Sequence, residues 1–210
     1  MNFITNPGLI ESESMHYIRS MLHKTWHETE LPVVERLIHT TGDLALESDI
    51  LIHPQAMTAG LEALAAGASV ITDVEMVRSG VAKQSLQLLG GKALCFLNDP
   101  RVPAKAKEWG LTRTMTALRL NKESLAGSII AVGNAPTALV EIMELAQDPS
   151  CCPALIVGMP VGFVGAKESK ELLWERQELP SITVRGTRGG SPLAAAAVNA
   201  LIYTAVGRTP

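Results

Sequence analysis

Five short apolar runs that alternate with segments of helical periodicity constrain the fold of this chain more than any other feature. The runs lie at residues 69–72, 93–97, 128–132, 154–157 and 182–184. Their length and their apolar side chains on both faces are typical of buried strands. Buried strands that are separated by helices pair in parallel through right-handed βαβ crossovers. The sequence therefore predicts a doubly wound α/β fold, with a mainly parallel sheet flanked by helices.

The region before the first of these runs has helical periodicity. Apolar residues recur at helical spacing over residues 11–26, 32–41 and 54–66. Ser12 or Ser14 could cap the first of these helices, and Pro32 fits the first turn of the second, which carries His39 near its C-terminal end. We therefore expect an N-terminal helical segment. No proline-rich linker, charge block or internal repeat interrupts residues 1–210, which we predict to form a single domain.

The composition restricts the partners and the location of the protein. Hydrophobic residues make up 47% of the chain and charged residues 19%, a balance typical of an ordered globular domain. The formal charge of -3 and the pI near 6.0 provide no broad basic surface, so we expect neither nucleic acid nor an anionic membrane as a partner. No lysine or arginine precedes Arg19, and no apolar run approaches the ~20 residues of a membrane span. We therefore expect no signal peptide or membrane anchor, and a cytoplasmic location.

Neither the histidines nor the cysteines form a pattern that predicts a metal site or a disulfide. His23 and His27 have the i, i+4 spacing of a helical metal pair, but no third ligand is evident in the sequence. We interpret them as part of a solvated helix face. Cys95, Cys151 and Cys152 lack the spacing of a disulfide framework, and we interpret them as reduced, mostly buried thiols.

Three of the predicted strands end in glycine-rich turns that lead into helices, at residues 132–137, 158–165 and 185–192. In a parallel sheet these turns lie at the carboxyl edge of the strands, where open α/β folds bind ligands. Backbone amides exposed by glycine, together with helix N-termini, would bind anionic oxygens there. Alternatively, the glycines and prolines only build tight turns between strand and helix. None of the turns has the spacing of a P-loop or a dinucleotide fingerprint, so nucleoside phosphates are not specifically indicated.

Arg36 and His39 are three residues apart on the second predicted helix, so their side chains are expected on the same face. A guanidinium can bind a carboxylate while a nearby imidazole transfers a proton. His39 is therefore a candidate catalytic residue, or else a structural histidine stabilised by the dipole at the helix end. Asp43 and Asp73 could orient His39, but we interpret both as helix caps.

Residues 36–43, with the sequence Arg-Leu-Ile-His-Thr-Thr-Gly-Asp, resemble the histidine motif of the precorrin-8X methylmutases and their cobalt-precorrin-8 counterparts. Further blocks are similar to those of the family and occur in the same order: residues 73–77 with Gly80, 133–139, 160–164 with 168–170, and 189–191. The resemblance covers nearly the whole chain. Its two longest blocks are specific, whereas the glycine-rich block 189–191 alone is a weak signal.

The resemblance implies an α/β homodimer that moves a methyl group from C-11 to C-12 of precorrin-8X or cobalt-precorrin-8. This sigmatropic shift would give hydrogenobyrinate or cobyrinate in cobalamin biosynthesis. It implies an isomerase without a cofactor, because no external methyl donor is consumed and any cobalt belongs to the tetrapyrrole substrate. In the family, the histidine that matches His39 is the proposed proton donor or acceptor at a ring nitrogen. The resemblance further implies these substrate contacts: Arg36, Ser14, Arg113, Thr40 and Asn134.

Two other functions remain open from the residues alone. The glycine-rich turns would also suit a nucleotide-dependent transferase of doubly wound fold, which predicts thermal stabilisation by a nucleotide or S-adenosylmethionine. A non-catalytic corrinoid carrier would use the same pocket and predicts bound, unconverted ligand. The residues do not indicate whether the substrate carries cobalt. A pocket shared between subunits would follow if the first helix or the alanine-rich last helix packs across a two-fold axis.

Overall fold

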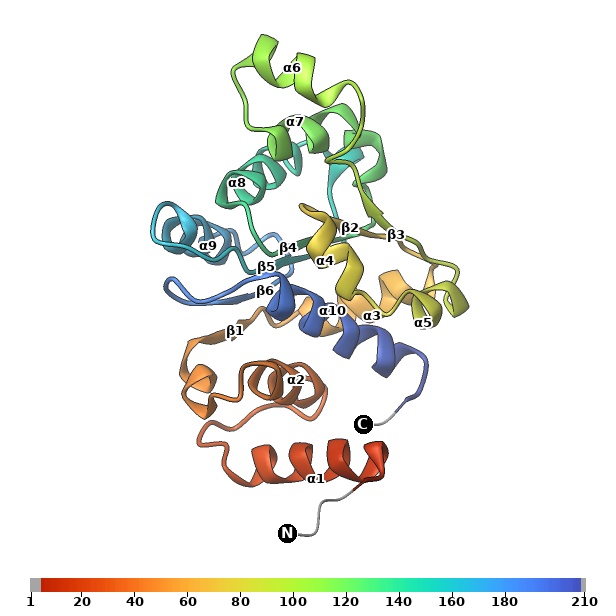
Figure 1. The fold of residues 1–210 in the computed structure, drawn as a ribbon, viewed down its shortest axis with the longest axis vertical. Helices are drawn as coiled ribbons and strands as arrows, with labels where there is room; N and C mark the ends of the chain where they lie inside the picture. Colours follow the sequence, from red (N-terminus) through yellow and green to blue (C-terminus); the bar gives the residue numbers. More distant parts are fainter. Residues whose placement is uncertain (1–4, 209–210) are drawn as a thin grey trace.

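The computed structural model describes residues 5–208, which form a six-stranded sheet with helices on both faces (Figure 1). The strands are β1 (Ile50–Ile52), β2 (Val70–Thr72), β3 (Ala93–Cys95), β4 (Ile129–Val132), β5 (Leu155–Gly158) and β6 (Ser181–Val184). Their order is β1-β6-β5-β4-β2-β3, in which β2 to β6 pair in parallel and β1 is antiparallel to β6. The predicted doubly wound α/β fold with a mainly parallel sheet is therefore confirmed.

Strand β1 is the one element of this sheet that the apolar pattern does not predict. It is only three residues long and directly follows the 3-10 helix Leu44–Asp49. Its partner β6 lies near the other end of the chain, with Ile50 opposite Val184. Ile50, Leu51 and Ile52 are apolar, as in the predicted strands, but they do not indicate that this strand pairs antiparallel with β6.

The helical segments within residues 5–208 fill the intervals between the strands. They are α1 (Pro7–Ser20), α2 (Leu31–Thr41), η1 (Leu44–Asp49), α3 (Ala56–Ala65), α4 (Glu75–Gly80), α5 (Lys83–Leu88), α6 (Val102–Trp109), α7 (Arg113–Leu120), η2 (Lys122–Ser124), α8 (Pro136–Leu145), η3 (Pro149–Cys151), α9 (Ala166–Glu175) and α10 (Ser191–Ala205). None of them combines the length and the apolar composition that a membrane crossing requires.

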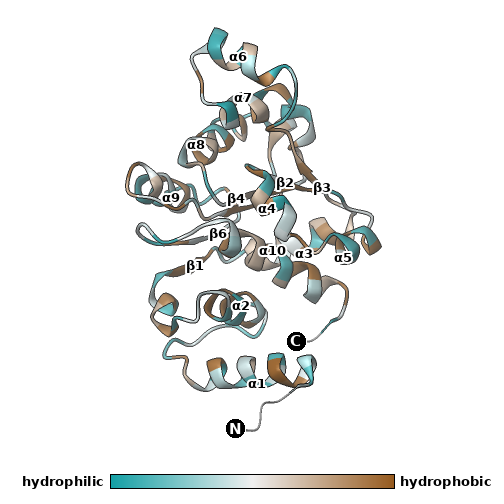
Figure 2. Ribbon diagram, in the orientation of Figure 1, coloured by the Kyte–Doolittle hydropathy of each residue, from teal (hydrophilic) through white to brown (hydrophobic). Residues whose placement is uncertain are grey.

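The two faces of the sheet are covered unequally. Helices α8 and α9 pack on one face, and α10 and α3 pack on the other. Two more helical layers follow on the second side, because α2 packs on α10 and α1 packs on α2 (Figure 1). Figure 2 shows hydrophilic helices such as α6 at the periphery of this arrangement. The N-terminal helical segment therefore forms an outer layer, separated from the sheet by α10.

Alternation along the strands divides the apolar core into two parts. Successive side chains of a strand point to opposite faces. In β4, Ile129 and Ala131 belong to the cluster with α2, α3 and α10, whereas Ile130 and Val132 belong to the cluster with α8 and α9. Close packing at one of these faces requires Gly158, because a Cβ there would lie 2.6 Å from Cδ2 of Leu173. Because both faces of these strands are buried, apolar residues are needed at consecutive positions along each strand.

Helix α10 is the central helix of the larger core. Ten of its 15 residues are buried inside the chain, including the run from Leu193 to Val198. The alanines allow it to approach both the sheet and α2 closely. The alanine-rich face is therefore already occupied within the chain. A dimer contact through the remaining residues of this helix stays a prediction.

The first helix differs from its predicted bounds. It begins at Pro7, where the side chain of Asn6 accepts hydrogen bonds from the amides of Gly8 and Leu9, so neither Ser12 nor Ser14 is its cap. It ends at Ser20, and the chain continues irregularly to the start of α2. His23 and His27 therefore do not share a helix face, and the i, i+4 interpretation of this pair is wrong. An Asn-Pro capping signal upstream of the apolar pattern accounts for the earlier start.

Candidate active site

Helix α2 delivers His39 to the molecular surface beside α1. The apolar residues of α2, among them Leu37 and Ile38, are buried, whereas His39 and Thr40 are exposed in its last turn. Gly42 ends the helix in the left-handed conformation with a φ of 64°, and its amide donates to the carbonyl of Ile38. Glycine adopts this conformation without the steric cost of a Cβ. The predicted position of His39 near a helix C-terminus is confirmed.

His39 and Ser14 line one cavity of about 530 Å³ between α1 and the C-terminal end of α2. Its wall combines polar groups with apolar surface from both helices and from the start of η1. The lining residues are Glu13, Ser14, Tyr17, Ile18, Ile38, His39, Gly42 and Leu44. Ser14 donates its hydroxyl hydrogen to the carbonyl of Ile10 at 2.7 Å, which leaves its oxygen available as an acceptor. The structure thus brings together two of the residues that the resemblance implies.

Sequence reasoning missed the other walls of this cavity. Tyr17 and Glu13 flank Ser14 on α1, and the i, i+3 spacing from Ser14 to Tyr17 could have identified the tyrosine. Leu44 could not have been identified, because its approach depends on the sharp turn after Gly42. Thr40 does not line the cavity; its hydroxyl donates to the carbonyl of Arg36 at 2.7 Å.

Arg36 points away from His39 despite the helical spacing. Its guanidinium lies 2.8 Å from Oε1 of Glu11 on α1 and 5.3 Å from the ring centroid of Tyr203 on α10. It lines a separate cavity of about 190 Å³ with Tyr203 and Arg208. The prediction that Arg36 and His39 act on one face is therefore wrong for this arrangement. The arginine side chain is long enough to reach its ion-pair partner Glu11 on another helix.

Arg113 and Asn134 lie outside the cavity that contains His39. Arg113 is the first residue of α7, in the upper part of the molecule in Figure 1, and Asn134 lies in the turn between β4 and α8. Both are exposed. Oγ1 of Thr112 is 3.1 Å from Oγ1 of Thr137, which joins the starts of the two helices. Within one chain the implied contacts are therefore not brought together at one site.

Asp73 occupies the amides of the first glycine-rich turn. Its buried carboxylate accepts hydrogen bonds from the backbone N–H groups of Gly133, Asn134 and Ala135 at 3.0, 2.8 and 2.8 Å. Burial raises the pKa of the Asp73 carboxyl, and the three amides oppose this shift. Since these three amides already bind an anion from the chain itself, they are not free for the anionic ligand that the glycine-rich turn was expected to bind. The substrate contact expected of the Asn134 side chain stays a prediction. The capping interpretation of Asp73 is closer to the observed contact.

The other two glycine-rich turns bind each other. The amide of Gly162 donates to the carbonyl of Thr187 at 3.2 Å, and the amide of Gly190 donates to the carbonyl of Met159 at 2.8 Å. Phe163 and Val164 remain almost fully exposed at the tip of the earlier turn. These contacts support the tight-turn interpretation for the amides that they use. Asp43 has the predicted capping role, because its side chain accepts from the amide of Ala45 at 2.9 Å.

The thiols and the acidic and histidine side chains offer little other chemistry. Burial raises the pKa of the thiols of Cys95 and Cys152, which favours the protonated, unreactive form. All three cysteines are free. Across residues 5–208, histidine, cysteine, aspartate and glutamate side chains form no group of three that could hold a metal ion. The cavity at His39 is therefore the site with the best combination of a proton-transfer group and apolar surface.

The fold and this cavity define an α/β enzyme with a histidine-containing site on a helical outer layer. Residues 9–204 match the family described as Precorrin-8X methylmutase. The chain is 41% identical over 202 residues to the precorrin-8X methylmutase of Sinorhizobium sp, covering 95% of this chain and 96% of the relative. It is 38% identical over 196 residues to the cobalt-precorrin-8 methylmutase of Priestia megaterium, covering 93% and 87%.

The fold agrees with a solved structure of the same kind. The crystal structure of precorrin-8x methyl mutase from Thermus thermophilus matches with a TM-score of 0.85 and 36% identity, covering 94% of this chain and 98% of that chain. The chain belongs to the precorrin-8X methylmutase family, whose members are isomerases that catalyse methyl migration in cobalamin biosynthesis. This membership does not favour the carrier or the nucleotide-dependent transferase.

Proposed function

We propose that this chain moves a methyl group from C-11 to C-12 of precorrin-8X or cobalt-precorrin-8, giving hydrogenobyrinate or cobyrinate. The observation that carries the proposal is the whole-length similarity to methylmutases combined with a cavity that contains His39. The reaction consumes no external methyl donor and uses no cofactor. Any cobalt is part of the substrate. Relatives of similar identity are named for each of the two substrates, so both remain candidates.

His39 is proposed to donate a proton, or a strong hydrogen bond, to a ring nitrogen of the macrocycle. Protonation polarises the conjugated system and favours migration of the methyl group between neighbouring carbons. A general acid of this kind contributes about 10²- to 10⁴-fold to the rate. Imidazole is suited to this step because its ordinary pKa lies close to neutral pH. The apolar wall formed by Ile18, Ile38 and Leu44 would lie against the ring and exclude water.

The remaining implied residues are proposed to bind the carboxylates at the periphery of the substrate. Ser14 supports this role by its place in the cavity, and Arg113 supports it by an exposed guanidinium. Thr40 and Asn134 are exposed and could donate hydrogen bonds. Arg36 can take this role only by exchanging Glu11 for a substrate carboxylate.

We further propose that the protein acts as a cytoplasmic homodimer. Two features support a dimer: the cavity at His39 is open to the surface, and Arg113 and Asn134 lie outside it on other elements of the chain. A second copy could place one group opposite the other. Mixing a His39→Ala chain with an Arg113→Ala chain tests this directly, because a site built from two chains would regain activity in the mixed dimer. Mixtures as inactive as either variant alone would reject a shared site.

The first experiment is an anaerobic incubation of the purified protein with precorrin-8X and, separately, with cobalt-precorrin-8. The visible spectrum follows the rearrangement, and a His39→Ala variant is the control. Conversion of either substrate without a methyl donor would establish the activity and identify the pathway branch. Binding of both without conversion would favour a carrier. Thermal stabilisation by a nucleotide or S-adenosylmethionine would favour a transferase.

A further inference from the structure

Lys170 is a buried lysine with no part in the proposed chemistry. It lies on α9, and only 2% of the residue is exposed. Lys167, one turn earlier on the same helix, has a side chain that is 56% exposed. Burial of an ammonium group is unfavourable unless it is hydrogen-bonded and compensated by nearby negative charge. A buried position for Lys170 therefore requires specific contacts that compensate its charge.

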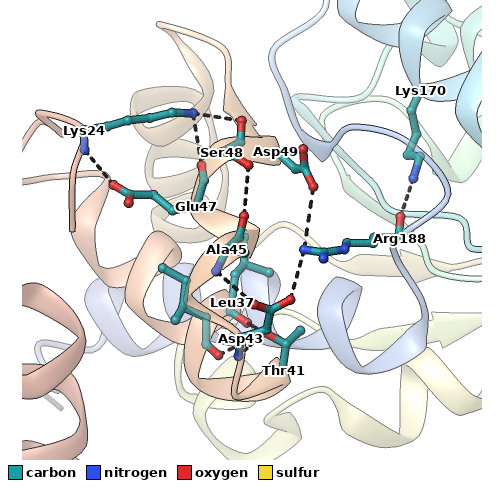
Figure 3. Close-up of polar contacts among 11 residues, drawn as sticks. Lys24, Leu37, Thr41, Asp43, Ala45, Glu47, Ser48, Asp49, Lys170 and Arg188 are labelled. Atoms are coloured by element: carbon teal, nitrogen blue, oxygen red, sulfur yellow. Dashed lines mark hydrogen bonds and ion pairs between the residues drawn. The ribbon is translucent and has the colours of Figure 1, made fainter. Parts of the chain in front are cut away.

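The ammonium group of Lys170 holds the turn between β6 and α10. Its Nζ donates to the backbone carbonyl oxygen of Arg188 (Figure 3). The turn contains Gly186, Gly189 and Gly190, all with positive φ, so its own conformational preferences are weak. Gly189 also approaches β5 closely, because a Cβ there would lie 2.5 Å from the carbonyl oxygen of Met159. Lys170 thus fixes the backbone at Arg188, with Gly186 on one side of it in the chain and Gly189 and Gly190 on the other.

The side chain of Arg188 reaches from this turn to the segment after α2. Its Nη1 lies 3.1 Å from Oδ2 of Asp43 and 3.7 Å from Oδ2 of Asp49 (Figure 3). Arg188 and Asp43 are each almost half exposed, and a pair of flexible surface side chains contributes little by itself. Here the arginine backbone is held by Lys170, so less freedom is lost when the pair forms.

Asp43 connects Arg188 to the wall of the His39 cavity. It stands between Gly42 and Leu44, which both line that cavity. Its Oδ1 accepts from the amide of Ala45, and its amide donates to the hydroxyl of Thr41 at 3.3 Å. A guanidinium bound to Oδ2 therefore restrains the turn that follows the His39 end of α2. A continuous set of contacts joins α9 to the cavity through Arg188.

We propose that Lys170 and Arg188 are positioning residues that hold the Gly42–Leu44 wall of the cavity in place for the reaction at His39. The part that concerns catalysis rests on the proposed function. Neither residue touches the cavity itself, since its lining includes neither of them. Their effect on this wall would be transmitted through Asp43, which is the closer of the two carboxylates at Arg188. A displacement of about 1 Å far from the reacting atoms can cost an enzyme ~10²-fold in rate.

The first test measures the wall without using the reaction. Hydrogen exchange of the amides from Thr41 to Ala45 is compared in the wild type, Arg188→Ala and Lys170→Met. Exchange in this segment is expected to be faster in both variants and unchanged in Lys167→Met, which removes an exposed lysine from the same helix. Arg188 is half exposed, so its truncation is not expected to prevent folding if Lys170→Met does. Unchanged exchange in folded Arg188→Ala would overturn the proposal.

The second test measures catalysis with whichever substrate the wild type converts. Lys170→Met and Arg188→Ala are each expected to lower kcat/KM by about 10- to 10²-fold. The double variant should be no worse than the poorer single one, because both act through the same contact. Arg188→Lys should recover part of the loss. Independent, multiplying effects or no recovery would overturn the positioning role. If the wild type converts neither substrate, the proposed function fails and the exchange experiment alone decides whether the wall is held.

Discussion

The sheet with its adjoining helices and the N-terminal helical layer are stabilised in different ways. Every residue of β4, β5 and β6 is buried, whereas α1 buries only Met15 and Ile18. Two reciprocal ion pairs supplement this small apolar contact, because each of α1 and α2 provides one arginine and one glutamate. The scaffold, including α2, is thus held by apolar burial, whereas α1 is attached by a small apolar contact and these ion pairs. Substitutions in the two regions should therefore affect different measured quantities.

The largest expected effect is on activity alone. His39→Ala should lower turnover by at least about 10²-fold, the low end of the loss of a general acid. The free energy of unfolding should change little, because His39 is exposed and surface substitutions usually stay within about 0.5 kcal/mol. Steady-state kinetics and denaturant unfolding of the same preparation measure both quantities. Near-normal turnover would reject His39 as the proton donor.

A substitution in the scaffold should do the opposite. Leu139→Ala removes a fully buried side chain between α8 and the sheet and should reduce the free energy of unfolding by about 2–5 kcal/mol. Leu9→Ala on α1, where the leucine is 54% exposed, is the matched control and should stay within about 0.5 kcal/mol. Urea unfolding measures both. Equal losses in the two variants would contradict the distinction between a buried scaffold and a lightly packed outer layer.

Arg36→Ala distinguishes substrate binding from attachment of α1. Loss of a charge-assisted contact to a carboxylate should weaken product binding by about 10- to 10²-fold. Glu11→Gln is the control, since it removes the same ion pair and keeps the guanidinium. A spectroscopic titration of each variant with the corrin product gives the affinities. If Glu11→Gln weakens binding as much as Arg36→Ala, then Arg36 acts by holding α1 and not by touching the ligand.

The last expected effect is a dependence of stability on pH. Burial lowers the pKa of Lys170 to about 8, although the charge of Asp49 opposes the shift. Between that value and its ordinary value of about 10.4, the unfolded chain binds more protons at this group than the folded chain. The free energy of unfolding should therefore rise with pH across this interval in the wild type relative to Lys170→Met. Paired unfolding curves at pH 7.5 and about 10 test this sign. A difference that is constant with pH would refute it.

The sequence predicts the scaffold better than the outer layer, for a physical reason. Strands β2 to β6 are apolar on both faces, and their local pattern is sufficient to identify them. Strand β1 depends on its distant partner β6, and its three residues do not show this. The same limit applies to Arg36. Spacing along α2 indicates the face on which it starts, but Glu11 on another helix determines where its guanidinium lies.

The positions of two candidate site residues were predictable from local sequence motifs. His39 lies at the end of its helix as expected, and Ser14 lies in the same cavity. The group that binds the amides of the turn after β4 was not predictable from its glycines, because that group is Asp73, sixty residues earlier. Likewise, no local signal indicates that Lys170 is buried or that its partner is a backbone carbonyl in another turn.

Asp73 has a further consequence for which ligands this fold can accept. The strand order reverses between β2 and β4, and open α/β folds bind ligands at such a switch point. Here the carboxylate of Asp73, at the end of β2, occupies the backbone amides of the turn after β4 that a ligand anion would otherwise bind. A free phosphate or nucleotide would have to displace this buried carboxylate from the three amides. At the usual binding position of the fold, a side chain of the protein itself therefore occupies these amides. The open cavity that contains His39 lies instead on the outer helical layer.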